Sequence, residues 1–151
     1  MSGDNPLLFM PGPFSGFPIP SASRICVVTK SPCTSPANSK YPFASTISYS
    51  NMGGFFGPEI KFAGYDGIVI TGKSSSPVYI IIENEKVEIR DANKFWGMNT
   101  DLFDKKFKEE LGDNEFETCY IGQAGENQVS YSCIIHTAGR AAGRGVGAVM
   151  G

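Results

Sequence analysis

The last twelve residues of the chain read Arg140-Ala141-Ala142-Gly143-Arg144-Gly145-Val146-Gly147-Ala148-Val149-Met150-Gly151. They bring together two arginines and four glycines. Glycine lets a backbone approach a ligand closely and reach positive φ, and arginine presents a rigid fork of donors that matches phosphate. The run therefore predicts a surface that binds a large anion. Because no polar tail closes the last element, we expect the chain to be part of a larger protein, or one subunit of a split one.

This C-terminal run matches no standard phosphate-binding motif, and two interpretations stay open. It lacks the G-x-G-x-x-G pattern of dinucleotide-binding folds, and no Gly-Lys-Ser/Thr follows as in a Walker loop. It is either a phosphate-binding loop without a standard motif or a flexible glycine hinge.

Composition is that of one soluble globular domain, over residues 1–151. The 151 residues suffice for a real core, and the 41% hydrophobic and 19% charged fractions are ordinary. A net charge of −2 argues against a nucleic-acid surface. The longest apolar run, Val78–Ile82, is too short to span a bilayer. We therefore expect neither nucleic acid nor a membrane as a partner.

The four cysteines do not form a metal-binding pattern. No C-x-x-C pair occurs, so we expect no zinc or iron–sulfur centre built from this chain alone. Cys26 and Cys133 lie inside apolar runs and are predicted to be buried free thiols. Reduced cysteines and the lack of a signal sequence predict a cytoplasmic protein.

Periodicity predicts an α+β fold that is rich in strands, with mostly antiparallel sheets and two or three short helices. Apolar and β-branched runs predict strands over residues 7–10, 23–30, 67–72, 78–83, 86–90, 117–121 and 129–135. Helices are predicted over 53–64 and 101–111, the second with Thr100 as N-cap and with Phe103, Phe107 and Leu111 as its buried stripe. The polar segment Ser31–Ser50 is predicted to be a long loop.

Three single residues have both a structural and a functional interpretation. Arg24 is either a solvated surface residue or a ligand contact. Asn51 precedes the first predicted helix, where it is an N-cap, and that helix start is also suited to an anion. His136 is the only histidine; a buried structural role is favoured over a general base or metal ligand, because no nucleophile or carboxylate partner stands near it in the sequence.

Four segments, in this order, resemble the N-terminal domain of the tungsten-containing aldehyde ferredoxin oxidoreductases. The segments are Arg24–Pro32, Asn51–Asp66, Ile121–Asn127, and Gly139–Arg144 with Gly147–Gly151. The resemblance covers nearly the whole chain from Asn5 onward, with His136-Thr137-Ala138 standing where the family typically has Asn-Asp-Gly.

The resemblance implies a reaction and its cofactors. A tungsten or molybdenum ion is held by two pterins, whose phosphates are bridged by magnesium, and an aldehyde becomes a carboxylic acid. A [4Fe-4S] cluster, held in domains not present in this chain, passes the electrons to ferredoxin. The N-terminal domain is the base that carries the bis-pterin. No catalytic residue is expected in this chain, which by itself is expected to be inactive.

The resemblance also implies which residues touch the cofactor. Asn51 and Ala141 match positions whose backbone carbonyls bind the magnesium, and Arg24 matches an arginine between pterin and cluster. Three residues match the loop around a pterin phosphate: Arg140, Gly143 and Arg144. Gly53 and Gly54 complete the cofactor-binding set, where glycine permits close approach.

These residues are far apart in the sequence and are predicted to converge on one surface. Two ligands of one magnesium ion lie at most about 4 Å apart, so the carbonyl oxygens of Asn51 and Ala141 should meet. The partners expected are the missing C-terminal domains or a separate subunit, and a homo-oligomer when the domain is alone. Two alternatives stay open: a non-catalytic module for a phosphate-bearing ligand, and an assembly module derived from the family.

Overall fold

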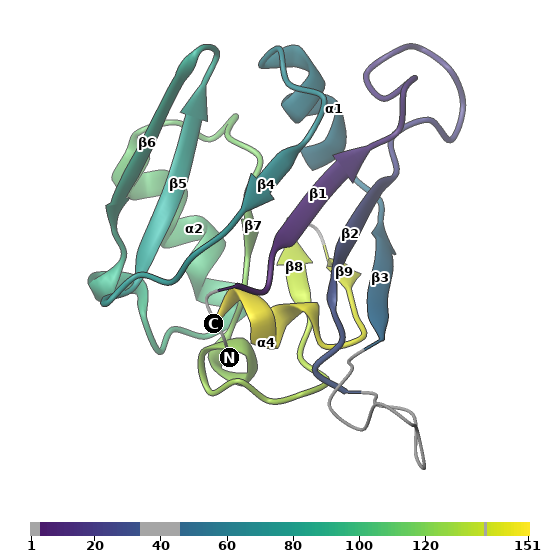
Figure 1. Ribbon diagram of the computed structural model, residues 1–151. Helices are drawn as coiled ribbons and strands as arrows, with labels where there is room; N and C mark the ends of the chain where they lie inside the picture. Colours follow the sequence, from purple (N-terminus) through teal and green to yellow (C-terminus); the bar gives the residue numbers. More distant parts are fainter. Residues whose placement is uncertain (1–3, 34–45, 138) are drawn as a thin grey trace.

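The computed structural model describes residues 4–33, 46–137 and 139–151 (Figure 1). Its strands are β1 Leu7–Pro11, β2 Ile25–Lys30, β3 Ile47–Met52, β4 Ile68–Ile70, β5 Val78–Glu83, β6 Lys86–Asp91, β7 Cys119–Tyr120, β8 Ile134–His136 and β9 Arg140–Ala142. Its helices are α1 Phe56–Phe62, α2 Thr100–Leu111, α3 Gln123–Glu126 and α4 Val146–Met150, with a 3-10 turn, η1, at Asn93–Phe95. The predicted α+β class is confirmed, with four α-helices in the described residues against the two or three predicted.

All described strand pairs are antiparallel. A four-stranded sheet has the order β3-β2-β1-β4, β5 and β6 form a hairpin, and a three-stranded sheet has the order β7-β8-β9. In Figure 1 the hairpin stands on the β4 side of the four-stranded sheet, and α2 lies behind the hairpin. The edge strand β3 contacts β9, which joins the four-stranded sheet to the three-stranded one.

The main core lies between these two sheets. Leu7 and Phe9 of β1 and Ile25 and Val27 of β2 alternate with more exposed neighbours and point inward, as the period of a strand requires. They pack in one buried cluster that also contains Met52, Ile60, Ile134, Ala142 and Val146. The core therefore depends on residues from both ends of the chain.

The C-terminal run packs into this core, so it is not a flexible hinge, whereas phosphate binding by this run stays a prediction. It forms β9, a tight turn and α4, whose residues Val146, Gly147 and Ala148 are buried. A Cβ at Gly147 would lie 2.5 Å from the Cys133 carbonyl oxygen, and one at Gly151 would lie 2.1 Å from the Gly125 carbonyl oxygen. These glycines allow α4 to pack closely against neighbouring backbone, so they serve packing.

A second cluster of rings joins α2 to the hairpin. The Phe107 ring centroid lies 5.0 Å from that of Tyr79 and 5.1 Å from that of Phe95. Phe107 is buried while Phe103 and Leu111 are half-buried, so the predicted stripe is the packed side of the helix. The N-cap position is Asn99, one residue before the predicted Thr100, and Gly112 ends the helix with φ 71°.

Two predicted segments are wrong in part. Of the loop predicted over 31–50, residues 34–45 lie outside the described residues, but Ile47 to Ser50 belong to β3. The strand predicted over 129–135 is reduced to Ile134–His136, because the backbone turns between Val129 and Ser132, with the Ser132 N–H donating to the Val129 carbonyl. Helix α3 was not predicted; it has only four residues and contains a glycine.

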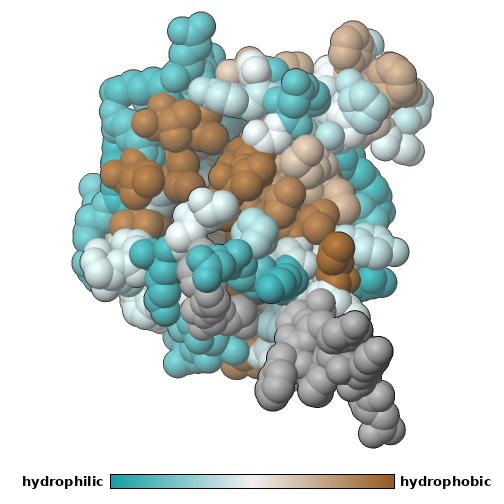
Figure 2. Space-filling model, in the orientation of Figure 1, coloured by the Kyte–Doolittle hydropathy of each residue, from teal (hydrophilic) through white to brown (hydrophobic). Residues whose placement is uncertain are grey.

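One face of the molecule carries a band of apolar side chains (Figure 2). Exposed apolar residues on the outer faces of the hairpin and the four-stranded sheet include Val78, Ile80, Val87, Ile89, Val69, Met10 and Ile47. Among the described residues, no helix combines the length and the apolar character that crossing a bilayer requires.

Candidate functional site

Strand β3 is fastened to the C-terminal run by two serine hydroxyls. The Gly143 N–H donates to Ser50 Oγ at 2.8 Å, and Ser48 Oγ donates to the Arg144 carbonyl at 3.0 Å. Both serines lie on the inner side of the strand, between exposed neighbours. Segments 93 and 96 positions apart in the sequence therefore lie side by side at this edge of the fold.

Arg140 lies against the glycine pair that follows β3. A Cβ at Gly54 would lie 3.5 Å from Arg140 Cγ, and one at Gly53 would lie 4.0 Å from Arg140 Cδ. Gly54 has φ 101°, in the region that favours glycine. The backbone of the glycine pair thus runs next to the stem of an exposed arginine.

Asn51 of β3 and Arg24, the residue before β2, lie at the same end of the sheet. Asn51 pairs with Cys26, and Ile25 pairs with Met52, so Arg24 follows across from Gly53. Both Asn51 and Arg24 are exposed. The structure thus places Arg24, Asn51, the glycine pair and Arg140 near the end of β3, and it places Gly143 and Arg144 farther back along the same strand, beside Ser50 and Ser48. The approach of the Asn51 and Ala141 carbonyl oxygens remains a prediction.

The prediction of Asn51 as a helix N-cap is wrong. Asn51 is the fifth residue of β3, and α1 begins at Phe56 with Phe55 at its N-cap position. The chain needs Gly53 and Gly54 to turn from the strand into the helix, which moves the helix start away from Asn51. A helix N-terminus therefore does not contribute to the surface around Asn51.

Tyr49 belongs to this surface but was not predicted. The Arg144 guanidinium lies 5.1 Å from the centroid of the Tyr49 ring, in the range of a cation–π contact. Tyr49 and Asn51 alternate with the inward-facing serines and are exposed. The alternation Ile-Ser-Tyr-Ser-Asn-Met is the signal that could have identified both the strand and its outward aromatic residue.

His136 is buried behind the glycine pair, as its structural interpretation predicts. It is 1% exposed; its Nδ1 lies 2.8 Å from the Thr118 carbonyl oxygen, and its Nε2 accepts the Phe55 N–H at 3.1 Å. A fully buried imidazole with both nitrogens engaged is satisfied without a ligand.

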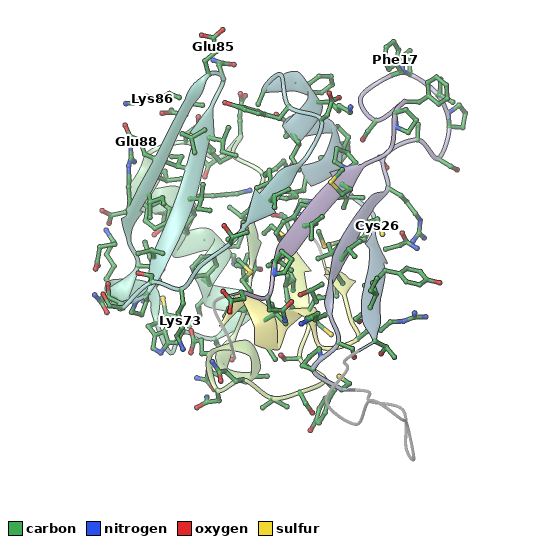
Figure 3. All side chains as sticks on the ribbon, in the orientation of Figure 1. Phe17, Cys26, Lys73, Glu85, Lys86 and Glu88 are labelled. Carbon is green, nitrogen blue, oxygen red and sulfur yellow. The ribbon has the colours of Figure 1, made fainter. Side chains whose placement is uncertain are left out.

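Arg24, Arg140 and Arg144 are exposed and bring positive charge to this part of the fold. Within the described part of the chain, no group of three or more His, Cys, Asp or Glu side chains could hold a metal ion. The four cysteines are free thiols, with Cys26 and Cys133 half-buried where burial was predicted. Burial raises the pKa of the Cys26 thiol, labelled in Figure 3.

Comparison with known proteins shows a match over the whole chain. Residues 1–151 match the family described as aldehyde ferredoxin oxidoreductase, N-terminal domain. A tungsten-containing aldehyde ferredoxin oxidoreductase of Pyrococcus abyssi is 46% identical over 151 residues, which cover 99% of this chain and 23% of that protein. The WOR-like subunit of an aliphatic sulfonate oxidoreductase of Pyrococcus furiosus is 39% identical, over 98% of this chain and 24% of that protein.

A solved structure has the same fold. The active-site complex BamBC of benzoyl coenzyme A reductase, in complex with 1,5-dienoyl-CoA, matches with a TM-score of 0.87 and 39% identity, over 99% of this chain and 21% of that one. The chain thus spans about a quarter of the length of the curated relatives it matches. It belongs to the aldehyde ferredoxin oxidoreductase N-terminal domain family.

Proposed function

We propose that this chain is the pterin-cofactor-binding base domain of a tungsten or molybdenum oxidoreductase that converts aldehydes to carboxylic acids. The observation that carries the proposal is the packing of Arg140 against Gly53 and Gly54, at the edge where β3 meets β9. This arrangement lays the aliphatic stem of Arg140 along the backbone of the glycine pair, and Arg140 itself is exposed at this edge. The 46% identity to aldehyde ferredoxin oxidoreductases supports aldehydes as the substrate class.

The donor set fits a phosphate-bearing cofactor with magnesium. Arg140 and Arg144 are exposed and offer planar forks of donors, which suit phosphate. Asn51 and Ala141 are exposed on packed strands, and their backbone carbonyls are oxygen ligands of the kind that magnesium prefers. Gly143 closes the turn between β9 and α4.

The role of this chain in the reaction is to bind the cofactor and to orient it. When bound, a tungsten bis-pterin supplies the two-electron oxidation of the aldehyde. The arginines neutralise phosphate charge and fix the position of the ligand on the sheet edge. Arg24, at the same end of the sheet, would supply the arginine between pterin and cluster that the family resemblance implies.

The remaining parts of the enzyme lie outside this chain. The [4Fe-4S] cluster, the substrate pocket and the ferredoxin contact belong to C-terminal domains or to a separate subunit, because the relatives are about four times as long. We place the complete enzyme in the cytoplasm.

The similarity to the benzoyl coenzyme A reductase complex favours a second candidate, a reductase of a coenzyme A thioester. The non-enzymatic alternative is a module that binds a phosphate-bearing ligand or serves in assembly. All three use the same arginine and glycine surface.

Binding of magnesium pyrophosphate, measured by calorimetry, tests the surface. Arg140→Ala should weaken binding about tenfold or more, because a charge-assisted hydrogen bond is lost. Lys73→Ala is the matched control, since Lys73 lies in the β4–β5 connection (Figure 3). Equal binding by both variants would contradict the site. Stoichiometric tungsten and pterin in protein isolated from its own source would support the enzyme, and their lack would favour the non-catalytic module.

A further inference from the structure

The two hydrogen bonds of His136 determine where its ring proton sits. The Thr118 carbonyl oxygen can only accept, so Nδ1, at 2.8 Å from it, carries the hydrogen. The Phe55 N–H can only donate, so Nε2, at 3.1 Å, presents its lone pair. The imidazole is therefore the neutral Nδ1–H tautomer, and it connects the end of β8 to Phe55, the N-cap residue of α1.

The same ring fixes the glycine pair against Arg140. His136 and Arg140 are paired across β8 and β9, so their side chains lie on the same face of the sheet. Gly54 fits against both: a Cβ there would lie 2.4 Å from His136 Cδ2 and 3.5 Å from Arg140 Cγ. Any movement of the ring or of the Phe55 amide therefore changes the turn on which the Arg140 stem rests.

The Glu117 carboxylate lies near His136 Nε2, the nitrogen that accepts the Phe55 N–H. Glu117 Oε2 lies 3.4 Å from His136 Nε2. This oxygen is buried and has no hydrogen-bond partner within the described part of the chain. A proton placed on Nε2 would give this carboxylate the donor that it lacks.

The other charged and titratable groups around the ring come from four elements. Arg140 is its neighbour on β9, and Cys119 is its neighbour on β7, where burial raises the pKa of the thiol and keeps it neutral. Burial, and to a smaller extent the nearby charge of Glu117, raises the pKa of the Glu59 carboxyl on α1. Asp104 of α2 accepts a hydrogen bond from the Thr118 hydroxyl.

We infer that His136 is a positioning residue for the proposed phosphate-binding surface: as a neutral imidazole it holds the Gly53–Phe55 turn against Arg140, and its protonation releases that turn. The inference rests on the proposed function in one respect: the turn is taken to support the arginine that binds phosphate. The step takes one proton from solvent onto Nε2. Nε2 then donates to Glu117, and the Phe55 N–H loses its acceptor.

Nuclear magnetic resonance can test this directly, because the chain has a single histidine. At neutral pH, correlation of the ring nitrogens with the ring protons should show Nδ1 protonated and Nε2 unprotonated. On acidification, protonation of Nε2 and faster hydrogen exchange at the Phe55 amide, after correction for intrinsic exchange, should follow one midpoint. A ring protonated on both nitrogens at neutral pH, or a Phe55 amide that is indifferent to ring protonation, would overturn the inference.

Variants separate positioning from simple structural support. Glu117→Gln removes the charge that favours the protonated ring, so the midpoint for Phe55 release should move to lower pH. Glu85→Gln, at the tip of the hairpin (Figure 3), should leave the midpoint unchanged. An unchanged midpoint in Glu117→Gln would overturn the pairing.

The ring itself can be replaced in the same assay. In His136→Ala the Phe55 amide should exchange about tenfold faster at neutral pH, through loss of one buried hydrogen bond, and His136→Gln should restore part of the protection. Equal exchange in wild type and His136→Ala would count against the inference. These measurements need no ligand, so a failure here leaves the pyrophosphate result intact, and the reverse holds as well.

Discussion

Gly54 illustrates, at the scale of a single residue, how the same amino acid serves two purposes in this chain. Gly145, Gly147 and Gly151 make room for neighbouring backbone around α4. Gly54 instead makes room for an imidazole and an arginine stem beside the candidate site. From the sequence, glycines can be compared only by their spacing. Their structural roles differ because each one lies against different neighbouring atoms.

Gly54→Ala should therefore destabilise the fold by about 3 kcal/mol. Positive φ costs of order 1 kcal/mol for alanine, and the overlap with the His136 ring adds about 2 kcal/mol. Gly72→Ala is the matched control, because Gly72 has φ 88° but nothing within 4 Å of its Cβ position. Urea denaturation measures both variants. Equal losses would mean that the ring contact contributes nothing.

At the scale of the element, β3 shows why a polar strand can be essential. Its inward side chains include Ser48 and Ser50, whose hydroxyls bond to the Arg144 carbonyl and the Gly143 N–H. An apolar residue at either position would leave a part-buried backbone group without this partner. The strand is polar because its neighbour is an irregular turn with free backbone groups.

Helix α2 depends on one ring more than on any of its other side chains. Phe107→Ala should lower the free energy of unfolding by about 3–5 kcal/mol, because Phe107 is buried among three aromatic rings. Leu102→Ala, in the same helix, should change it by less than about 0.5 kcal/mol, since Leu102 is 53% exposed. Thermal unfolding followed by circular dichroism compares them. A loss for Leu102→Ala as large as that for Phe107→Ala would contradict this packing.

At the scale of the whole molecule, the apolar band in Figure 2 is the main unpaired feature. Monomeric proteins seldom expose such continuous apolar surface. The chain covers 23% of an aldehyde ferredoxin oxidoreductase relative, and we propose that parts corresponding to the rest of that relative cover this band.

The isolated chain should therefore self-associate in a concentration-dependent manner. Sedimentation velocity should show dimers or larger species, and Ile89→Lys should shift them toward monomer, because Ile89 is 69% exposed on the outer face of β6. Leu102→Lys, in α2 on the other side of the hairpin, should leave the distribution unchanged. A strict monomer over a wide concentration range would exclude this association.

Local patterns were sufficient for much of the fold. The strand-forming residues of β1 and β2, the presence of the β5–β6 hairpin and the phenylalanine spacing in α2 are each encoded within a few residues. The facing of the hairpin is not, because the alternation of β6 predicts Val87 and Ile89 on the inner side and the structure leaves them 51% and 69% exposed. The order of four segments was sufficient to identify the family. These features could be predicted because the physical periods of strands and helices repeat along a single stretch of chain.

Only the tertiary structure decided the role of β3, the packed state of the C-terminal run and the place of His136. Ser50 belongs in a strand because of Gly143, 93 positions later. The His136 ring meets the Phe55 amide 81 positions away, and no period within either segment specifies that contact. Hydrogen bonds and close approaches between distant segments depend on how the sheets pack, and a linear pattern carries no record of them.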